Sequence, residues 1–183
     1  YTTLFRSSNS MQTNLSAYLE NEGKSFFSIA LYWPIQDELD LRDTLNAWSQ
    51  KASGRQLALP VARPDKHLDF HLWQDSDMLT PSQHGVPEPD PLNPDRPAIT
   101  PDCILIPCVG WSSATMDGKT KFWRLGYGGG YFDRTLADLR QRNPNLICIG
   151  IAFNWQKLDN SQWTAKAHDE PLDMLLTESG LLG

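Results

Sequence analysis

A chain of 183 residues is long enough to bury the core of one domain. Hydrophobic residues make up 40% of it and charged residues 21%, and no apolar run approaches the ~20 residues that span a membrane. The net charge of −6 argues against a nucleic-acid binder, which is typically basic. We therefore expect a single cytoplasmic domain over residues 1–183, a monomer or weak homodimer, with no nucleic-acid or membrane partner.

The predicted elements alternate between strands and helices. Residues 26–33 are nearly continuously apolar, as expected of a strand buried on both faces. Leu41, Leu45, Trp48 and Ala52 then follow helical spacing, and Gly54 is placed to end that helix. Further strands are predicted at residues 56–62, 68–73, 103–109, 146–153 and 172–177. This order favours an α/β fold, a three-layer sandwich around a largely parallel sheet.

Two further features lie within this pattern. Residues 74–101 contain seven of the 13 prolines, which favours an extended, ordered strap over a floppy coil. The three cysteines lie in apolar runs without zinc-like spacing, and we expect them to be buried, reduced thiols without a catalytic role. They are Cys103, Cys108 and Cys148.

Residues 124–134 have the sequence Arg-Leu-Gly-Tyr-Gly-Gly-Gly-Tyr-Phe-Asp-Arg, with four glycines within five positions. Glycine lets main-chain N–H groups approach a ligand closely. Phe132, Leu136 and Leu139 then form one apolar stripe, so the loop opens into a helix whose amino end favours anions. Six Lys or Arg residues against three Asp between residues 117 and 142 make this stretch basic within an acidic chain. Two arginines, three aromatic residues and an aspartate are more than a flexible turn requires, so the segment predicts a phosphate site.

The spacing of the glycines matches neither common nucleotide loop, since Tyr131 interrupts G-x-G-x-x-G and no Walker lysine follows. It resembles the signature of the 5-formyltetrahydrofolate cyclo-ligase family. Residues 32–38 (Tyr-Trp-Pro-Ile-Gln-Asp-Glu), 59–61 (Leu-Pro-Val), 168–173 (His-Asp-Glu-Pro-Leu-Asp) and 177–178 (Thr-Glu) are similar to other family motifs in the same order. The resemblance extends from about residue 26 to the end of the chain.

The resemblance implies an enzyme that uses ATP and Mg²⁺ to convert 5-formyltetrahydrofolate into 5,10-methenyltetrahydrofolate, with release of ADP and phosphate. Asp133 and Asp169 would bind Mg²⁺. Trp33 and Glu38 would contact the folate, together with Tyr127, Gly128, Gly129, Gly130 and Tyr131. The residues implied to bind ATP are Arg124, Leu125, Gly126, Tyr127, Gly128, Gly129, Gly130, Tyr131 and Phe132, of which Arg124 and Tyr127 would also act in catalysis.

Three departures from the family pattern stand out. The family usually opens with a basic helix that reaches the ATP phosphates, whereas this sequence offers only Arg6 before Lys24, so we expect that helix to be missing or the ATP site incomplete. Residues 111–123 form a longer connection than is typical, and Phe132 stands where tyrosine is common.

Each site residue also has a simpler interpretation, and two other functions fit the motifs. Taken alone, Glu38 suits a helix amino end, Trp33 a core position and Asp169 a turn. A non-catalytic folate- or nucleotide-binding regulator would fit the sparse basic residues at the start. A sugar-phosphate isomerase or CoA-transferase-like enzyme would fit a glycine-rich anion loop in an α/β fold, but would not need ATP.

Overall fold

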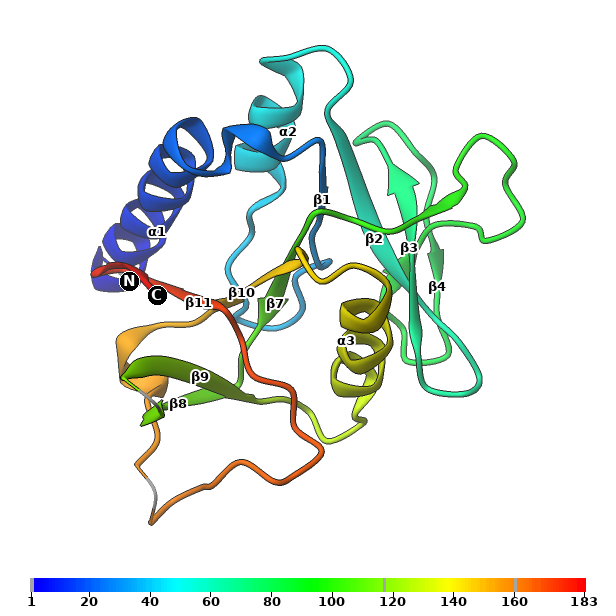
Figure 1. Ribbon diagram of the computed structural model, residues 1–183. Coiled ribbons are helices and arrows are strands. Elements are labelled where there is room, and N and C mark those ends of the chain that lie inside the picture. The colour runs from blue at the N-terminus through cyan, green and yellow to red at the C-terminus, as the bar shows by residue number, and fades with distance from the viewer. Residues whose placement is uncertain (1, 117, 160) are drawn as a thin grey trace.

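The computed structural model describes residues 2–116, 118–159 and 161–183 (Figure 1). The central sheet has eight strands in the order β12 (Gly180–Leu182), β11 (Met174–Thr177), β10 (Ile147–Ile151), β7 (Cys103–Pro107), β1 (Ser28–Ala30), β2 (Gln56–Ala62), β3 (Leu68–Trp73) and β6 (Ala98–Ile99). Strands β11, β10, β7, β1 and β2 run parallel to one another, while β12 and β3 are antiparallel to their inner neighbours, and β6 is antiparallel to β3.

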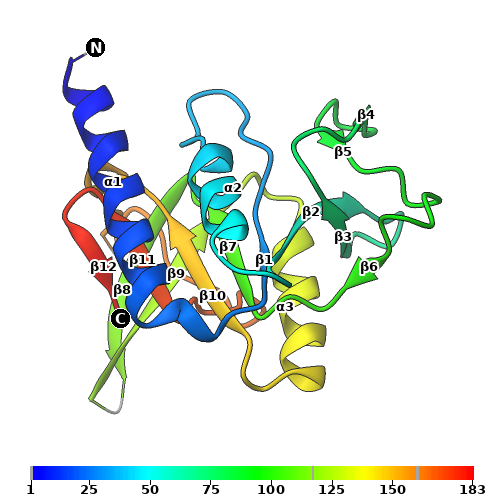
Figure 2. The same ribbon diagram turned by 90° about the horizontal axis from the view of Figure 1, so that it is seen from above.

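Helices cover both faces of this sheet (Figures 1 and 2). Helices α1 (Thr2–Asn21) and α2 (Arg42–Gln50) pack on one face. Helix α3 (Tyr131–Arg142) packs on the other, beside the hairpin of β8 (Gly110–Met116) and β9 (Lys119–Leu125). Strand β7 shows the alternation, because Cys103 and Leu105 belong to the first core and Ile104 and Ile106 to the second. The predicted three-layer α/β sandwich with a largely parallel sheet is confirmed.

Strands β2 and β3 have the predicted bounds, and the other apolar runs contain shorter strands. The prediction that residues 26–33 are buried throughout is wrong at Phe27, whose side chain is 68% exposed. The ladder of β1 begins only at Ser28, and the Asp102 carboxylate accepts the N–H groups of Phe27 and Ser28 at 2.9 Å. Phe27 thus lies at the amino edge of the sheet, outside the core.

The two helices predicted from periodicity are present. Gly54, with φ at 87°, follows α2, and Leu136 and Leu139 of α3 are buried. The strap between β3 and β7 adds β4 (Thr80–Pro81), β5 (Pro87–Glu88) and β6, and the last of these extends the sheet. Short 3-10 turns, η1 (Gly23–Ser25) and η2 (Asn154–Gln156), follow α1 and β10.

Two remaining expectations concern the core and the membrane. All three cysteines are buried and unpaired, as expected. Within the described ranges, no helix has both the length and the apolar character that crossing a membrane requires.

Candidate active site

The order of the strands reverses between β1 and β7. The chain passes from β1 to β2 on one side of this point and from β7 to β10 on the other. The loops that follow β1 and β7 therefore leave the same edge of the sheet and diverge. Ligands of open α/β sheets bind in the crevice at such a point, beyond the carboxyl ends of the strands. The order of the strands therefore makes the segments that follow Ala30 and Pro107 the candidate binding site.

A cavity of about 310 Å³ occupies this position. Its walls come from the loop after β1, the ends of β7 and β10, and η2. They combine apolar side chains with a few polar groups, as small-molecule sites usually do. The lining includes Tyr32, Gln36, Asp37, Glu38, Cys108, Val109, Tyr127, Phe153, Trp155 and Gln156. A hollow of about 480 Å³ lies elsewhere, between α1 and the β11–β12 edge, and contains none of the predicted site residues among its described lining.

Glu38 and Tyr127 meet at this cavity. The Tyr127 hydroxyl donates a hydrogen bond to Oε1 of Glu38 at 3.2 Å, and the N–H of Ile35 donates to Oε2 at 2.9 Å. Burial raises the pKa of Glu38, although these two hydrogen bonds oppose the shift. The structure thus brings together the predicted folate-side glutamate and a tyrosine of the glycine loop.

Cys108 lines the same cavity as a buried thiol. Its burial raises the thiol pKa to about 12, so the thiol is neutral near pH 7. That the cysteines have no catalytic role stays a prediction.

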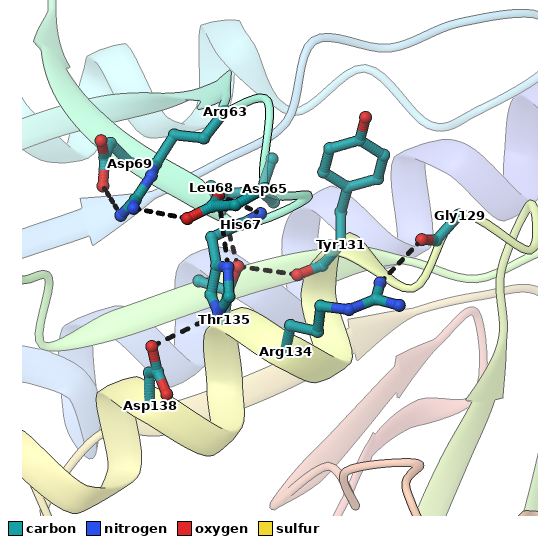
Figure 3. Close-up of polar contacts among 10 residues, drawn as sticks. All are labelled: Arg63, Asp65, His67, Leu68, Asp69, Gly129, Tyr131, Arg134, Thr135 and Asp138. Atoms are coloured by element: carbon teal, nitrogen blue, oxygen red, sulfur yellow. Dashed lines mark hydrogen bonds and ion pairs between the residues drawn. The ribbon is translucent and has the colours of Figure 1, made fainter.

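The glycine loop (residues 126–130) runs between β9 and α3, with a guanidinium group against each end. A Cβ added at Gly126 would lie 2.3 Å from Nη1 of Arg124, and one added at Gly130 would lie 2.6 Å from Nη1 of Arg134. Figure 3 shows Arg134 reaching back from α3 to the Gly129 carbonyl, to which Nη1 donates at 3.0 Å. Glycines at these two positions therefore allow arginine side chains to lie directly against the main chain.

Main-chain geometry explains Gly128 and gives a second reason for glycine at position 130. Positive φ occurs at Gly128 (88°) and at Gly130 (70°), which begins α3 without a side-chain cap. The first N–H groups of a helix have no intrahelical partner, so they remain available to an anion. Gly129 has no positive φ, but its added Cβ would lie 2.9 Å from Cδ2 of Tyr131.

Thr135 fixes the amino end of α3 to the sheet. Its hydroxyl donates to the Tyr131 carbonyl at 2.7 Å and accepts the N–H of Leu68 in β3 at 2.8 Å (Figure 3). On its other side, the Tyr131 hydroxyl contacts His84 Nε2 at 3.0 Å and Gln83 Nε2 at 3.2 Å. The proline-rich strap therefore touches the residue that follows the glycine loop.

The Asp133 carboxylate contacts the main chain of the residue that follows Asp169. Asp133 Oδ2 accepts from Nη2 of Arg124 at 3.0 Å, and its Oδ1 accepts from the N–H of Glu170 at 3.1 Å. Asp169 accepts the N–H of Lys166 at 2.7 Å. The segment that carries Asp169 is thereby attached to the first turn of α3, where Asp133 follows the glycine loop.

Three other predicted site residues, Trp33, Phe132 and Leu125, contact arginine side chains or a neighbouring strand. The Arg42 guanidinium lies 4.1 Å from the Trp33 ring centroid, and Trp33 packs on the first core outside the described lining of the cavity. Phe132 lies beneath Arg124, 5.0 Å from its guanidinium carbon to the ring centroid. Leu125 ends β9 and pairs with Gly110.

Sequence reasoning missed Arg134 and Trp155. Arg134 could have been found from its place next to Asp133 in the glycine motif. Trp155 gave no local signal, because its position at the cavity depends on the fold.

The three α/β layers, the cavity where the strand order reverses and the glycine loop with its two arginines together define an α/β protein with a candidate small-molecule site. The chain belongs to the 5-formyltetrahydrofolate cyclo-ligase family, because the model of that family matches residues 3–178. It is accordingly an enzyme of a ligase family of one-carbon metabolism.

Individual relatives agree. A 5-formyltetrahydrofolate cyclo-ligase of Mycoplasma pneumoniae is 29% identical over 151 residues, which cover 82% of this chain and 73% of that protein. One of Haemophilus influenzae is 30% identical over 138 residues, covering 73% and 67%. The solved structure of a 5,10-methenyltetrahydrofolate synthetase from M. pneumoniae has a TM-score of 0.68 and 26% identity, covering 97% of this chain and 88% of that one. The NMR structure of the Aquifex aeolicus synthetase, at 24% identity and a TM-score of 0.66, covers 94% and 80% and shares the fold.

Proposed function

We propose that this protein converts 5-formyltetrahydrofolate and ATP into 5,10-methenyltetrahydrofolate, ADP and phosphate. The observation that carries the proposal is the hydrogen bond between Glu38 and Tyr127, which joins a cavity suited to a pterin to a loop suited to phosphate. The named activity of the relatives supports the same reaction.

The proposed reaction needs no protein nucleophile. The formyl oxygen attacks the γ-phosphorus and ADP leaves, which turns a poor leaving group into phosphate. N10 then attacks the formyl carbon and loses its proton, and expulsion of phosphate leaves the methenyl bridge. Phosphoryl transfer of this kind is catalysed mainly by positioning and by neutralisation of charge.

The glycine loop and its arginines would carry out that neutralisation. Arg124 and Arg134 lie against the two ends of the loop, and α3, whose first N–H groups lack intrahelical partners, begins directly after it. Arg124 is only 8% exposed, so its charge is weakly screened by solvent. We assign ATP binding to residues 124–132, with Arg124 and Tyr127 nearest the transferred phosphoryl group.

Glu38 would orient the folate. Its carboxylate lines the cavity and accepts hydrogen bonds, and the pterin ring presents N–H donors that a carboxylate can accept. Tyr127 would then hold the formyl end of the folate next to the phosphate loop. Trp33 would act indirectly. Its ring packs beneath the Arg42 guanidinium and against the first core, and so supports the segment after β1 that carries Glu38.

Asp133 and Asp169 would hold a Mg²⁺ ion beside the proposed phosphate site. A carboxylate has about four acceptor positions, so each can keep its present hydrogen bonds and accept a further partner. Mg²⁺ is usually held by one or two carboxylates together with substrate phosphates and water. When bound, the ion would offset negative charge on the transferred group, and the two aspartates would fix its place beside the glycine loop.

The test is to incubate the protein with 5-formyltetrahydrofolate, with and without ATP and Mg²⁺, and follow the near-ultraviolet absorbance of the methenyl product. We expect product only when both are present, with ADP and phosphate formed in equal amounts. Binding of folate without turnover would instead favour the regulator, and ATP-independent chemistry would favour the isomerase or transferase class.

A further inference from the structure

Exposed apolar side chains gather at the mouth of the cavity. Eight large hydrophobic side chains are exposed in the described part of the chain, and three of them line this one cavity. Scattered exposed hydrophobic residues need no explanation, but a cluster around a hollow marks a binding surface. The three are Val109, Tyr127 and Trp155, and Trp155 is 71% exposed.

The Trp155 indole is held in a defined orientation. Its ring stacks on the buried ring of Phe153, with centroids 6.2 Å apart and an angle of 12° between the planes. Turn η2 is fastened on both sides, because Gln156 Nε2 donates to the Cys108 carbonyl at 2.9 Å and the N–H of Asn154 donates to Glu178 at 2.9 Å. One face of the indole is therefore supported by protein, and the side chain is ready to receive a flat ring.

The size of the cavity limits what it can hold. A volume of about 310 Å³ lies at the lower end of the ~300–1,000 Å³ range of small-molecule pockets. It suits the pterin bicycle beside Glu38 better than a complete folate. The rest of the folate must then extend across the mouth, where Tyr127 and Trp155 are exposed.

Chemistry distinguishes the two rings that might stack there. Adenine is separated from the transferred phosphoryl group by a ribose and two further phosphates. The aminobenzoyl ring of the folate is bonded directly to N10, the atom that attacks the formyl carbon, so it must lie next to the reacting centre. On the basis of the proposed function, we propose that Trp155 is the platform on which the aminobenzoyl ring of the reduced folate stacks.

Binding is measured first, because it does not require turnover. Calorimetric titration with 5-formyltetrahydrofolate compares the wild type with Trp155→Ala, Trp155→Phe and the control Phe27→Ala. Phe27 is a similarly exposed aromatic residue, at 68%, but it lies at the opposite edge of the sheet. We expect Trp155→Ala to weaken binding by about tenfold, while Trp155→Phe and Phe27→Ala stay within about twofold of the wild type.

Turnover and fragments complete the test. The KM for folate should rise in Trp155→Ala, whereas the KM for ATP and kcat should change little. Inhibition by 4-aminobenzoylglutamate should weaken in this variant, and inhibition by a reduced pterin that lacks the aminobenzoyl group should not. Circular dichroism and thermal unfolding of all variants check that the fold is retained.

Each contrary result has a separate meaning. A wild type that turns over folate while Trp155→Ala binds it normally would overturn the role of Trp155 and leave the proposed function standing. A raised KM for ATP, or weaker inhibition by the pterin fragment, would assign the indole to adenine or to the pterin and would also overturn the inference. A wild type that binds folate without turnover would overturn the proposed function, and the binding comparison would then decide on Trp155. Failure of the wild type to bind folate would overturn both.

Discussion

Tyr127 and Glu38 are 89 positions apart in the sequence, yet the hydroxyl of one donates to the carboxylate of the other at 3.2 Å. Tyr127 belongs to the glycine loop and Glu38 to the segment after β1, on opposite sides of the point where the strand order reverses. This hydrogen bond connects the two halves of the candidate active site. A substitution on either side should therefore affect both proposed substrates, with the larger effect on the nearer one.

Glu38→Gln should abolish a pH dependence of folate binding. The pKa of Glu38 is raised by burial, so in the wild type the carboxylate gains a proton at a higher pH than an ordinary glutamate, near 4.3. We expect kcat/KM for folate to fall as the pH is lowered through that raised pKa. In Glu38→Gln, kcat/KM for folate should be lower and should not change with pH over the range in which Glu38 titrates. If the inflection in kcat/KM persists in this variant, the pH dependence belongs to another group.

The same pKa shift fixes how Glu38 affects stability. A raised pKa means that the folded protein holds this proton more tightly than the unfolded chain, so the wild type loses stability as the pH rises from the ordinary to the raised value. Glu38→Gln lacks this loss, so its free energy of unfolding should gain on the wild type as the pH rises. Urea unfolding of both proteins at several pH values measures the difference. Tyr32, Cys108 and Tyr127, which lie near Glu38, keep their protons throughout this range because their pKa values are raised.

Asp133→Asn should reduce both turnover and stability. The substitution removes the negative charge next to Arg124. Both oxygens of Asp133 accept hydrogen bonds, so the NH₂ group of asparagine would face a donor, either Arg124 or the N–H of Glu170. We expect a loss of about 1–3 kcal/mol in the free energy of unfolding and a fall of at least about tenfold in kcat. Asp138→Asn is the matched control, because Asp138 lies on the same helix with a half-exposed side chain. Wild-type turnover of Asp133→Asn at saturating Mg²⁺ would remove Asp133 from the site.

Gly128→Ala and Gly54→Ala form a second matched pair. Both glycines have positive φ, at 88° and 87°, and an added Cβ would meet no atom within 4 Å at either position. Backbone strain should therefore cost each variant a similar ~1–2 kcal/mol of stability. Only Gly128→Ala should raise the KM for ATP, because only Gly128 lies in the proposed phosphate loop. Equal effects on ATP in both variants would show that this loop has a purely structural role.

Arg140→Met should alter the Mg²⁺ dependence of turnover. Arg140 donates to Glu170 at 2.9 Å, to the Pro171 carbonyl at 2.7 Å and to Asp173 at 3.2 Å, so it holds the segment that carries Asp169. Without these contacts, Asp169 should be poorly placed and more Mg²⁺ should be needed for half-maximal rate. Arg142→Met, in the same last turn of α3, is the control. An unchanged Mg²⁺ requirement in a folded Arg140→Met protein would contradict this positioning.

The sequence predicted the parts of the fold that have local signals. Strands β2 and β3 were predicted with their observed bounds, because each apolar run is flanked by polar turn residues. Helix α1 was not predicted from its residues, since Ser, Thr and Asn, which have low helix propensity, interrupt its apolar positions. The β8–β9 hairpin was missed because β9 buries only Phe122 completely, so it lacks the alternation of a half-buried strand.

The candidate site divides in the same way. The glycine loop and Glu38 have sequence signals, and the structure brings them together at one cavity. The position of Trp155 at the cavity could not be predicted from the sequence. It depends on the contact of η2 with the end of β7 and on the packing of the indole on Phe153. The metal-binding roles of Asp133 and Asp169 and the ATP-binding role of residues 124–132 stay predictions.

Asp133 and Arg140 hold the same short segment, residues 170–173, from positions seven residues apart on α3. Seven residues are close to two full turns, which is why both side chains face the same neighbour. A single-residue insertion or deletion between them would rotate one relative to the other by about 100° and detach one end of the segment. This part of the helix should therefore keep its length in functional variants of the chain, whereas an exposed turn such as residues 51–54 can change length at little cost.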